Sequence, residues 1–321
     1  MAATTTRWLL AGLACLALWP APGLAQGGSW ENTVAAGQEA YQRADYAEAD
    51  KQFLAALKQA EGFGPQDPRL ATSLNGLAAL YRSLGRYTEA EPLHKRALAI
   101  REKVLGPDHP DVAQSLNDLA VLYVRQGKPA EAEPLYRRSL AIREVSLGPD
   151  HPDVAQSLNN LAVLFVGEGR YAEAEPLYKL ALAIREKALG RDHPDVARSF
   201  NNLAGIYHIQ GRYVAAEPLY RRALEIVEKA LGPAHPELAT DLNNLAAVYH
   251  SQGRYAEAEP MYQRSLAIWL KALGPEHPRV AESLENLGRL YADLGRYADA
   301  VTYYQRAYAI NAKHAKENPA D

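Results

Sequence analysis

Cysteine is nearly absent from this sequence: Cys15 is the single one among 321 residues. It lies in an N-terminal segment that we expect to be removed, which leaves a mature chain without any thiol. Disulfides, thiolate metal sites and thiol nucleophiles are then excluded. The folded chain must owe its stability to packing.

A strong excess of either charge is also lacking. The formal net charge is −3, from 35 Lys and Arg against 38 Asp and Glu. This balance provides no basic field that would recruit nucleic acid and no polyacidic tail. Apolar residues are plentiful enough for a buried core, so disorder is expected only at the two ends.

Long hydrophobic runs are missing as well. The most apolar stretch, from Trp8 to Trp19, falls short of the ~20 residues that a membrane-spanning helix needs. Arg7 precedes this stretch and the small-residue stretch Gly23-Leu24-Ala25 follows it. This order is typical of a secretory signal peptide, so residues 1–25 are predicted to be cut off after Ala25.

The signal peptide predicts an exported protein, periplasmic or secreted, with a bacterial envelope as the expected location. An uncleaved membrane anchor is the alternative, and another exported compartment stays open. A lipoprotein is not favoured, because Gly12 stands three positions before Cys15 where an aliphatic residue is expected.

Motifs for catalysis and nucleotide binding are missing too. The chain has no Gly-x-Ser-x-Gly elbow, no phosphate-binding glycine-rich loop and no dinucleotide fingerprint. Serines such as Ser157 recur as small packing residues with no histidine placed to act as a base. We therefore predict neither an enzyme nor a cofactor.

What the chain does have is an internal repeat. Thirteen identical residues occupy Leu105–Asn117 and Leu147–Asn159, which begin 42 residues apart, and looser copies follow at the same interval. A fixed period of this length indicates one supersecondary unit stacked many times. Such stacks form extended binding surfaces and seldom a deep catalytic pocket.

Each period contains two helical patterns. In the first, Val154, Leu158, Leu161 and Phe165 share one helix face, and Gly169 ends the helix. The second begins at Tyr171. Its Pro176 follows the first turn, where a missing backbone hydrogen bond costs least, so we expect a slight bend and no break.

The spacing of small and aromatic residues is that of tetratricopeptide repeats, seen literally in Leu287-Gly288 with Tyr291 and in Ala300 with Tyr304. HEAT-type repeats share the period but lack this spacing. The 42-residue length, the Asp-His-Pro turn, Leu-Asn-Asn-Leu-Ala and Glu-Ala-Glu-Pro-Leu-Tyr together resemble the kinesin light chain type of repeat.

This resemblance implies an all-α, right-handed solenoid of seven repeats and fourteen helices. The expected layout is a linker at 26–30, a solenoid at 31–313 and a frayed polar tail at 314–321. The repeats are expected at 31–64, 67–106, 109–148, 151–190, 193–232, 235–274 and 277–313.

The resemblance also implies that the first helix of each pair lines a concave groove. One groove-facing position holds asparagine five times: Asn75, Asn117, Asn159, Asn201 and Asn243. An amide side chain suits the backbone of an extended peptide, and similar asparagines in the kinesin light chain type contact bound peptide. An alternative stays open, in which they bond neighbouring helices and hold the repeat spacing.

Further along the same face the residues differ between copies, as a specificity surface should. One row reads Arg82, Val124, Val166, His208, His250 and Ala292, and the adjacent row reads Ser83, Arg125, Gly167, Ile209, Ser251 and Asp293. Arg82, Arg125 and Arg198 lie toward the N-terminal half, whereas Glu282, Glu285 and Asp293 lie toward the C-terminal end. We expect this polarity to orient an extended ligand with its acidic part near the arginines.

The repeated Asp-His pairs, such as Asp108 with His109, invite a metal hypothesis. Successive turns are on the order of 10 Å apart, however, which is too far for imidazoles to share one ion. We therefore predict that these side chains tie down the loop and the helix start.

The sequence thus predicts an exported scaffold that binds an extended or helical segment of a protein partner. Two alternatives stay open: a regulatory subunit of a separate enzyme, and a module that self-assembles through its last repeat (Tyr303, Tyr304, Tyr308). The chain ends about eight residues after its last predicted helix, which argues against a fused catalytic domain.

Overall fold

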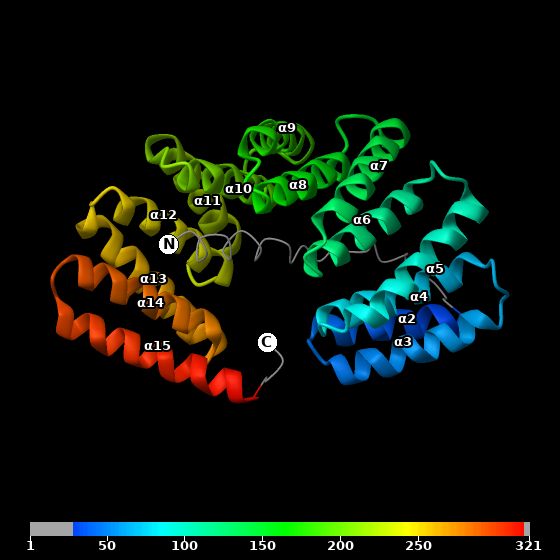
Figure 1. The fold of residues 1–321 in the computed structure, drawn as a ribbon, viewed down its shortest axis with the longest axis horizontal. Coiled ribbons are helices and arrows are strands. Elements are labelled where there is room, and N and C mark those ends of the chain that lie inside the picture. Colours follow the sequence, from blue (N-terminus) through cyan, green and yellow to red (C-terminus); the bar gives the residue numbers. More distant parts are fainter. Residues whose placement is uncertain (1–27, 318–321) are drawn as a thin grey trace. The chain divides into compact units, whose positions relative to one another are not determined.

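The computed structural model describes residues 28–317, and the predicted signal peptide lies outside them. These residues form fourteen helices and no strand, arranged as consecutive antiparallel pairs (Figure 1). The all-α fold of seven helix pairs is confirmed. By contacts the chain divides into two compact units, one ending at Ile184 and one beginning at Arg185.

The first unit contains three complete pairs and continues into a fourth. Its helices are α2 (Ser29–Gln42), α3 (Tyr46–Glu61), α4 (Pro68–Ser83), α5 (Tyr87–Leu105), α6 (Pro110–Arg125), α7 (Pro129–Leu147), α8 (Pro152–Gly167) and the first part of α9 (Tyr171–Leu189). Each helix packs on its successor up to α8, and the first helices α2, α4 and α6 also contact one another in sequence.

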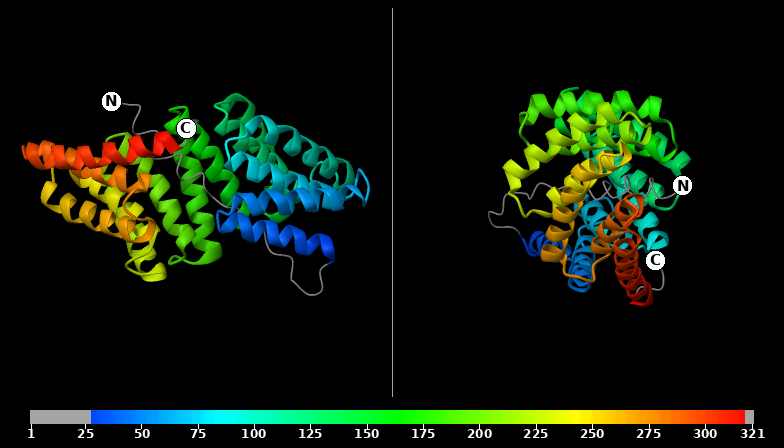
Figure 2. Two further views of the ribbon diagram at one scale, coloured as in Figure 1. Left: turned by 90° about the horizontal axis from the view of Figure 1, so that it is seen from below. Right: turned by 90° about the vertical axis from the view of Figure 1, so that its left-hand side faces the viewer.

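The second unit repeats this arrangement. Its complete helices are α10 (Pro194–Ile209), α11 (Tyr213–Leu231), α12 (Pro236–Ser251), α13 (Tyr255–Leu273), α14 (Pro278–Asp293) and α15 (Tyr297–Glu317). Consecutive helices pack together, and α10 contacts α12. The pairs of each unit lie side by side in the further views as well (Figure 2).

The helix borders follow from local sequence. In every pair after the first, the first helix begins with a proline. The missing N–H of proline costs nothing at this position, because the first turn of a helix has no backbone partner for it. Gly169 follows α8 with φ +74°, a conformation that favours glycine. Second helices such as α9 run through their internal proline without interruption, as predicted.

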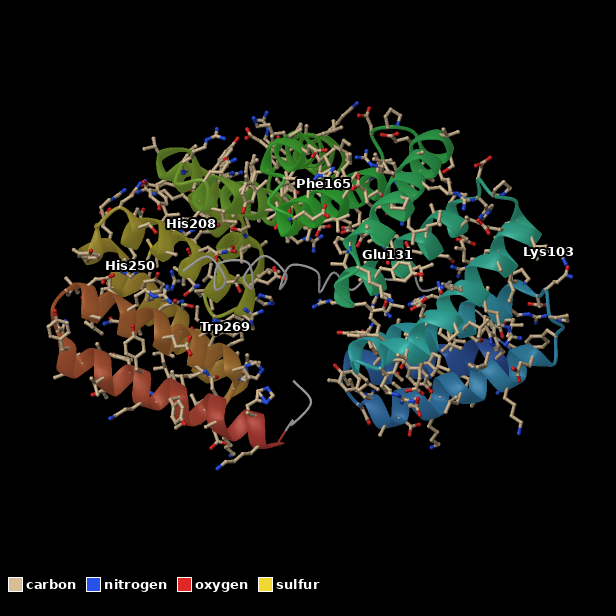
Figure 3. All side chains as sticks on the ribbon, viewed as in Figure 1. Lys103, Glu131, Phe165, His208, His250 and Trp269 are labelled. Atoms are coloured by element: carbon tan, nitrogen blue, oxygen red, sulfur yellow. The ribbon has the colours of Figure 1, made fainter. Side chains whose placement is uncertain are left out.

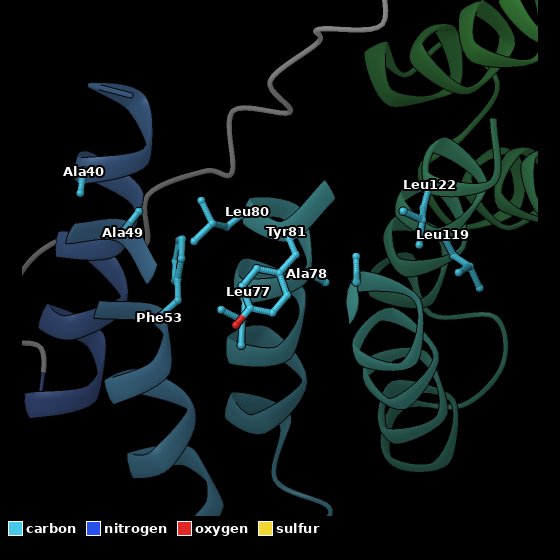
Figure 4. Close-up of a cluster of buried hydrophobic side chains, with 10 residues drawn as sticks. Ala40, Ala49, Phe53, Leu77, Ala78, Leu80, Tyr81, Leu119 and Leu122 are labelled. Atoms are coloured by element: carbon cyan, nitrogen blue, oxygen red, sulfur yellow. The ribbon is translucent and has the colours of Figure 1, made fainter. Parts of the chain in front are cut away.

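Small residues let the helices of a pair approach closely, and large residues fill the remaining space. Figure 4 shows Phe53 between α2 and α4, beside Leu77 and Leu80. A Cβ added to Gly37 would lie 2.9 Å from the Phe53 ring, so this contact requires glycine. The predicted core face of α8 (Val154, Leu158, Leu161 and Phe165) is buried.

Two predicted borders differ from the structure. Helix α2 begins at Ser29, inside the expected linker, because Trp30 packs against the cluster around Leu70 and donates from Nε1 to Ser73 Oγ at 2.9 Å. Helix α15 continues to Glu317, beyond the expected end at Lys313, through residues that favour helix formation.

Candidate functional site

The histidine of the repeated turn caps the following helix. His109 precedes α6, and its Nδ1 accepts a hydrogen bond from the Asp111 backbone N–H at 3.1 Å. The same contact recurs in four further repeats, at His151, His193, His235 and His277. The predicted role of the histidine at the helix start is confirmed: its side chain caps a free backbone N–H of the first turn.

The asparagine row connects successive first helices. Asn75 on α4 donates to Asp118 on α6 at 3.3 Å, and Asn160 on α8 donates to Asn117 at 2.7 Å. In the second unit Asn286 on α14 donates to Asn243 on α12 at 2.8 Å. Four of the five asparagines are buried: Asn75, Asn117, Asn159 and Asn243.

These hydrogen bonds between neighbouring first helices agree with the alternative in which the asparagines hold the repeat spacing. The buried amides of Asn75, Asn117 and Asn243 each gain a partner on a neighbouring first helix, since an unpaired amide would be costly there. Contact between the asparagines and a bound peptide stays a prediction.

Asp241 is a buried carboxyl that the sequence reasoning missed. It lies on α12, and its Oδ1 accepts a hydrogen bond from Asn201 of α10 at 2.6 Å, whereas its Oδ2 has no partner among the described residues. Burial raises its pKa to about 7, with a further rise from Glu237 and an opposing effect from the Asn201 hydrogen bond. The signal was available as an aspartate where five other repeats have serine.

His94 is a second departure from the repeat that was missed. It occupies the position of the buried tyrosines Tyr136, Tyr178, Tyr220 and Tyr262 and is itself fully buried. Its Nδ1 lies 3.0 Å from Asn75 Oδ1, and its Nε2 has no partner in the described chain. Burial lowers its pKa to about 3, with smaller contributions from Arg82 and Arg101, so the ring is neutral.

The two predicted histidines of the variable row lie on consecutive first helices (Figure 3). His208 Nε2 is 3.2 Å from Ser251 Oγ, and His250 Nε2 is 2.8 Å from Asp293 Oδ2. Burial lowers the pKa of His208. The structure therefore brings together residues of the two variable rows, one from each of two neighbouring helices.

The three predicted arginines differ in their surroundings. Arg198 forms an ion pair with Asp195 at 2.7 Å on its own helix. Arg82 ends α4 and Arg125 ends α6, and neither forms a hydrogen bond or ion pair with any residue in the range 28–317.

The acidic residues of the C-terminal end have partners within their own unit. Arg279 lies 3.2 Å from Glu282, and Asn311 donates to Glu285 at 3.0 Å. Together with the contact between His250 Nε2 and Asp293 Oδ2, each of these three acidic residues has a polar partner within its own unit.

The part of the chain that the structure describes holds no cluster of three His, Cys, Asp or Glu side chains suited to a metal ion. None of the helices described is both long and apolar enough to span a membrane.

Comparison with known families identifies the repeats. The tetratricopeptide repeat model matches in six overlapping stretches: 36–103, 69–144, 124–187, 167–229, 195–271 and 241–313. This chain is a member of the tetratricopeptide repeat family. Comparison with curated proteins finds no match.

Solved structures support the kinesin light chain resemblance. A putative kinesin light chain of Podosopora anserina with nearly identical TPR-like repeats is 30% identical, with a TM-score of 0.55 over 64% of this chain and 98% of that one. BtubC (BKLC) from P. vanneervenii is 28% identical, with a TM-score of 0.59 over 74% of this chain and 92% of that one.

A more distant similarity is to a Rap protein solved with the competence and sporulation factor. It is 18% identical, with a TM-score of 0.64 over 90% of this chain and 76% of that one, which shows the fold alone. The tetratricopeptide fold is a binding scaffold, typical of protein–protein interaction modules.

Proposed function

We propose that this protein is an exported scaffold that binds an extended or helical segment of a partner protein along its first helices. The observation that carries the proposal is the pair of variable rows on these helices. The residues that cap, pack and connect the repeats recur from copy to copy, whereas the positions at the ends of α4, α6, α10 and α12 change. Variation on this face of a repeating scaffold supports selective binding there.

Two kinds of residue have different roles in this proposal. The asparagine row maintains the spacing of the first helices and contacts a partner backbone only where an amide atom stays accessible. Selectivity comes from Arg82, Arg125, His208 and His250. The Rap protein complexed with the competence and sporulation factor is a precedent for the binding of a partner by this fold.

Photocrosslinking at matched positions tests the proposal. A photoreactive residue replaces either Val124, half-buried on the first helix α6, or Val145, exposed on the second helix α7. In an extract of the source cells, we expect a crosslinked partner from position 124 and none from position 145. Equal crosslinking from both positions would place binding elsewhere.

Export is part of the proposal and is supported by the N-terminal sequence alone. The N-terminus of the protein recovered from fractionated cells provides the test. A chain that begins at Gln26 outside the cytoplasm supports export, and an intact Met1 in the cytoplasm overturns it.

Self-association is the second candidate function, and the last helix favours it. Tyr304 is 40% exposed, whereas the equivalent tyrosines of the four preceding repeats are buried, and Tyr308 is 75% exposed on the same helix. An exposed aromatic face of this kind is typical of a contact surface. Light scattering over a range of concentrations should show a dimer that Tyr308→Lys abolishes; a concentration-independent monomer overturns this alternative.

A further inference from the structure

The exposed face of the last helix carries an apolar stripe. In α15 the side chains of Tyr297, Val301, Tyr304 and Tyr308 are exposed to 70%, 51%, 40% and 75%. Their spacing of four, three and four residues places all of them on one face of the helix. The terminal repeats of a solenoid require a polar outer face for solubility. An apolar stripe in this position therefore indicates a contact surface.

Val301 departs from the repeat in a way that favours this interpretation. The five preceding second helices have glutamate at the equivalent position: Glu91, Glu133, Glu175, Glu217 and Glu259. Glu259 accepts a hydrogen bond from Tyr291 of the following repeat at 2.6 Å, and Arg254 donates to Glu217 at 2.7 Å in the same way. Because Val301 replaces this polar group with an apolar one, α15 is more than an internal second helix without a successor.

Tyr308 occupies a position that packs against the following first helix elsewhere in the chain. Its equivalents are Leu98 on α5 and Leu140 on α7, and they pack against the buried clusters of α6 and α8. This face of a second helix thus receives another helix, and no further helix of residues 28–317 follows α15 (Figure 1). A helix from another molecule is the occupant that fits.

The first helix of a second copy does not provide a matching surface. The first repeat is one residue shorter than the others, so Ser29 and Thr33 of α2 align with Val112 and Leu116 of α6. Val112 and Leu116 belong to the cluster that receives the preceding second helix, whereas Ser29 and Thr33 carry hydroxyl groups. Head-to-tail stacking would leave Tyr308 against these polar groups. The exposed α15 of a second copy provides the apolar surface that α2 lacks.

We propose that two copies of this chain form a symmetric dimer through α15, with the two helices antiparallel. A two-fold axis at the middle of the stripe places Tyr297 of one copy against Tyr308 of the other, and Val301 against Tyr304. Such an isologous contact uses the same patch twice and closes, so it does not continue into a fibre. This inference rests on the second candidate function and specifies its interface.

The area of the stripe is sufficient for a specific contact. With ~200 Å² for a fully exposed tyrosine side chain, the three tyrosines expose together about 370 Å² in each copy. The exposed Ala298, Gln305 and Ala309 lie on the same helix and widen the surface. Two copies then bury on the order of 1,000 Å² in total, which is the lower limit for a biological interface.

Charge substitutions at the two ends of the stripe test the pairing. Tyr297→Glu and Tyr308→Lys each place a charge in the apolar contact, twice in every symmetric dimer. We expect each variant alone to dimerise at least about 100-fold more weakly than the wild type in sedimentation equilibrium. An equimolar mixture should form a heterodimer, because the introduced glutamate of one copy then lies against the introduced lysine of the other. This restoration also shows that both variants are folded.

Val214→Lys is the matched control. Val214 is 86% exposed on α11 in the same compact unit, so its substitution adds a charge away from α15 and should change dimerisation by less than about twofold. A dimer that persists in both tyrosine variants overturns α15 as the surface. A mixture that stays monomeric overturns the antiparallel pairing, since parallel or head-to-tail contacts do not bring the two introduced charges together.

The outcomes separate this inference from the functions proposed above. A wild type that is monomeric at all concentrations overturns self-association itself, whereas a wild-type dimer without restoration in the mixture overturns only the interface. Crosslinking at position 124 on α6 depends on neither result, so failure of this dimer and failure of the scaffold function are distinguishable.

Discussion

Asp241 stands where the other five complete copies have serine. In three of them, Ser115, Ser157 and Ser199 accept a hydrogen bond from an arginine of the preceding helix: Arg101, Arg143 and Arg185. The position equivalent to these arginines before Asp241 is the buried Val227. The carboxyl is thus buried without the cation that the repeat would supply, which explains its raised pKa.

The raised pKa predicts a specific pH dependence of stability. The pKa of Asp241 is about 7 in the folded chain against an ordinary 3.8, so the folded state holds a proton that the unfolded state releases. The associated stability is complete below about pH 4 and is lost as the pH rises to about 7. The free energy of unfolding of Asp241→Ser minus that of the wild type should therefore increase by roughly 2–4 kcal/mol from pH 4 to pH 8, since each pKa unit corresponds to about 1.4 kcal/mol.

Urea unfolding at the two pH values measures this shift. Asp108→Ser is the control, because Asp108 is exposed in a turn, and its unfolding should follow the wild-type pH dependence. The other groups that act on the Asp241 carboxyl or respond to it are Asn201 on α10, Tyr220 on α11 and Glu237 on α12. A difference between Asp241→Ser and the wild type that does not change with pH would show that Asp241 titrates normally.

The helices themselves depend on short signals at their ends. A histidine or aspartate caps the start of each first helix from α4 onward where the cap is described, and a glycine of positive φ follows its end. These signals act within one turn of the chain, so they are visible in the sequence. Helix α2 lacks a side-chain cap and depends on the contacts of Trp30.

Two glycines at the end of α8 provide a matched pair of substitutions. Gly169 has φ +74°, whereas Gly167 is helical and a Cβ there would meet nothing within 4 Å. Gly169→Ala should lower the free energy of unfolding by about 1 kcal/mol because alanine is strained at positive φ. Gly167→Ala should raise it by up to about 1 kcal/mol, through helix propensity and reduced entropy of the unfolded chain.

Chemical denaturation of the two variants beside the wild type measures both effects. Changes of the same sign would contradict the assigned conformations. The two sites are two residues apart, so a difference between them reports backbone geometry and not location.

The molecule consists of two compact units, each with its own stacked pairs. In repeat arrays, stability is approximately the sum of each repeat and its contacts with its neighbours. Leu245→Ala removes a fully enclosed side chain of α12 and should cost about 2–5 kcal/mol. In native-state hydrogen exchange, Leu245→Ala should lower amide protection more in residues 185–317 than in residues 28–184. Leu77→Ala on α4 should lower it more in residues 28–184. Uniform loss across residues 28–317 in both variants would indicate a single cooperative unit.

The sequence by itself determined the repeat, the number of helices, the caps and the family, because these depend on signals that recur every 42 residues or act within one turn. It also located the variable rows on the first helices. It did not determine which polar side chains meet across repeats, since contacts between residues 43 positions apart depend on the register in which neighbouring helices pack.

The tertiary structure alone decided that Asn75 and Asn117 bond polar side chains of the next first helix and that His250 pairs with Asp293. It also decided that Asp241 is buried without a cation. The physical reason is common to these cases: the free energy of a polar side chain is set by its desolvation and by the partners that packing brings to it.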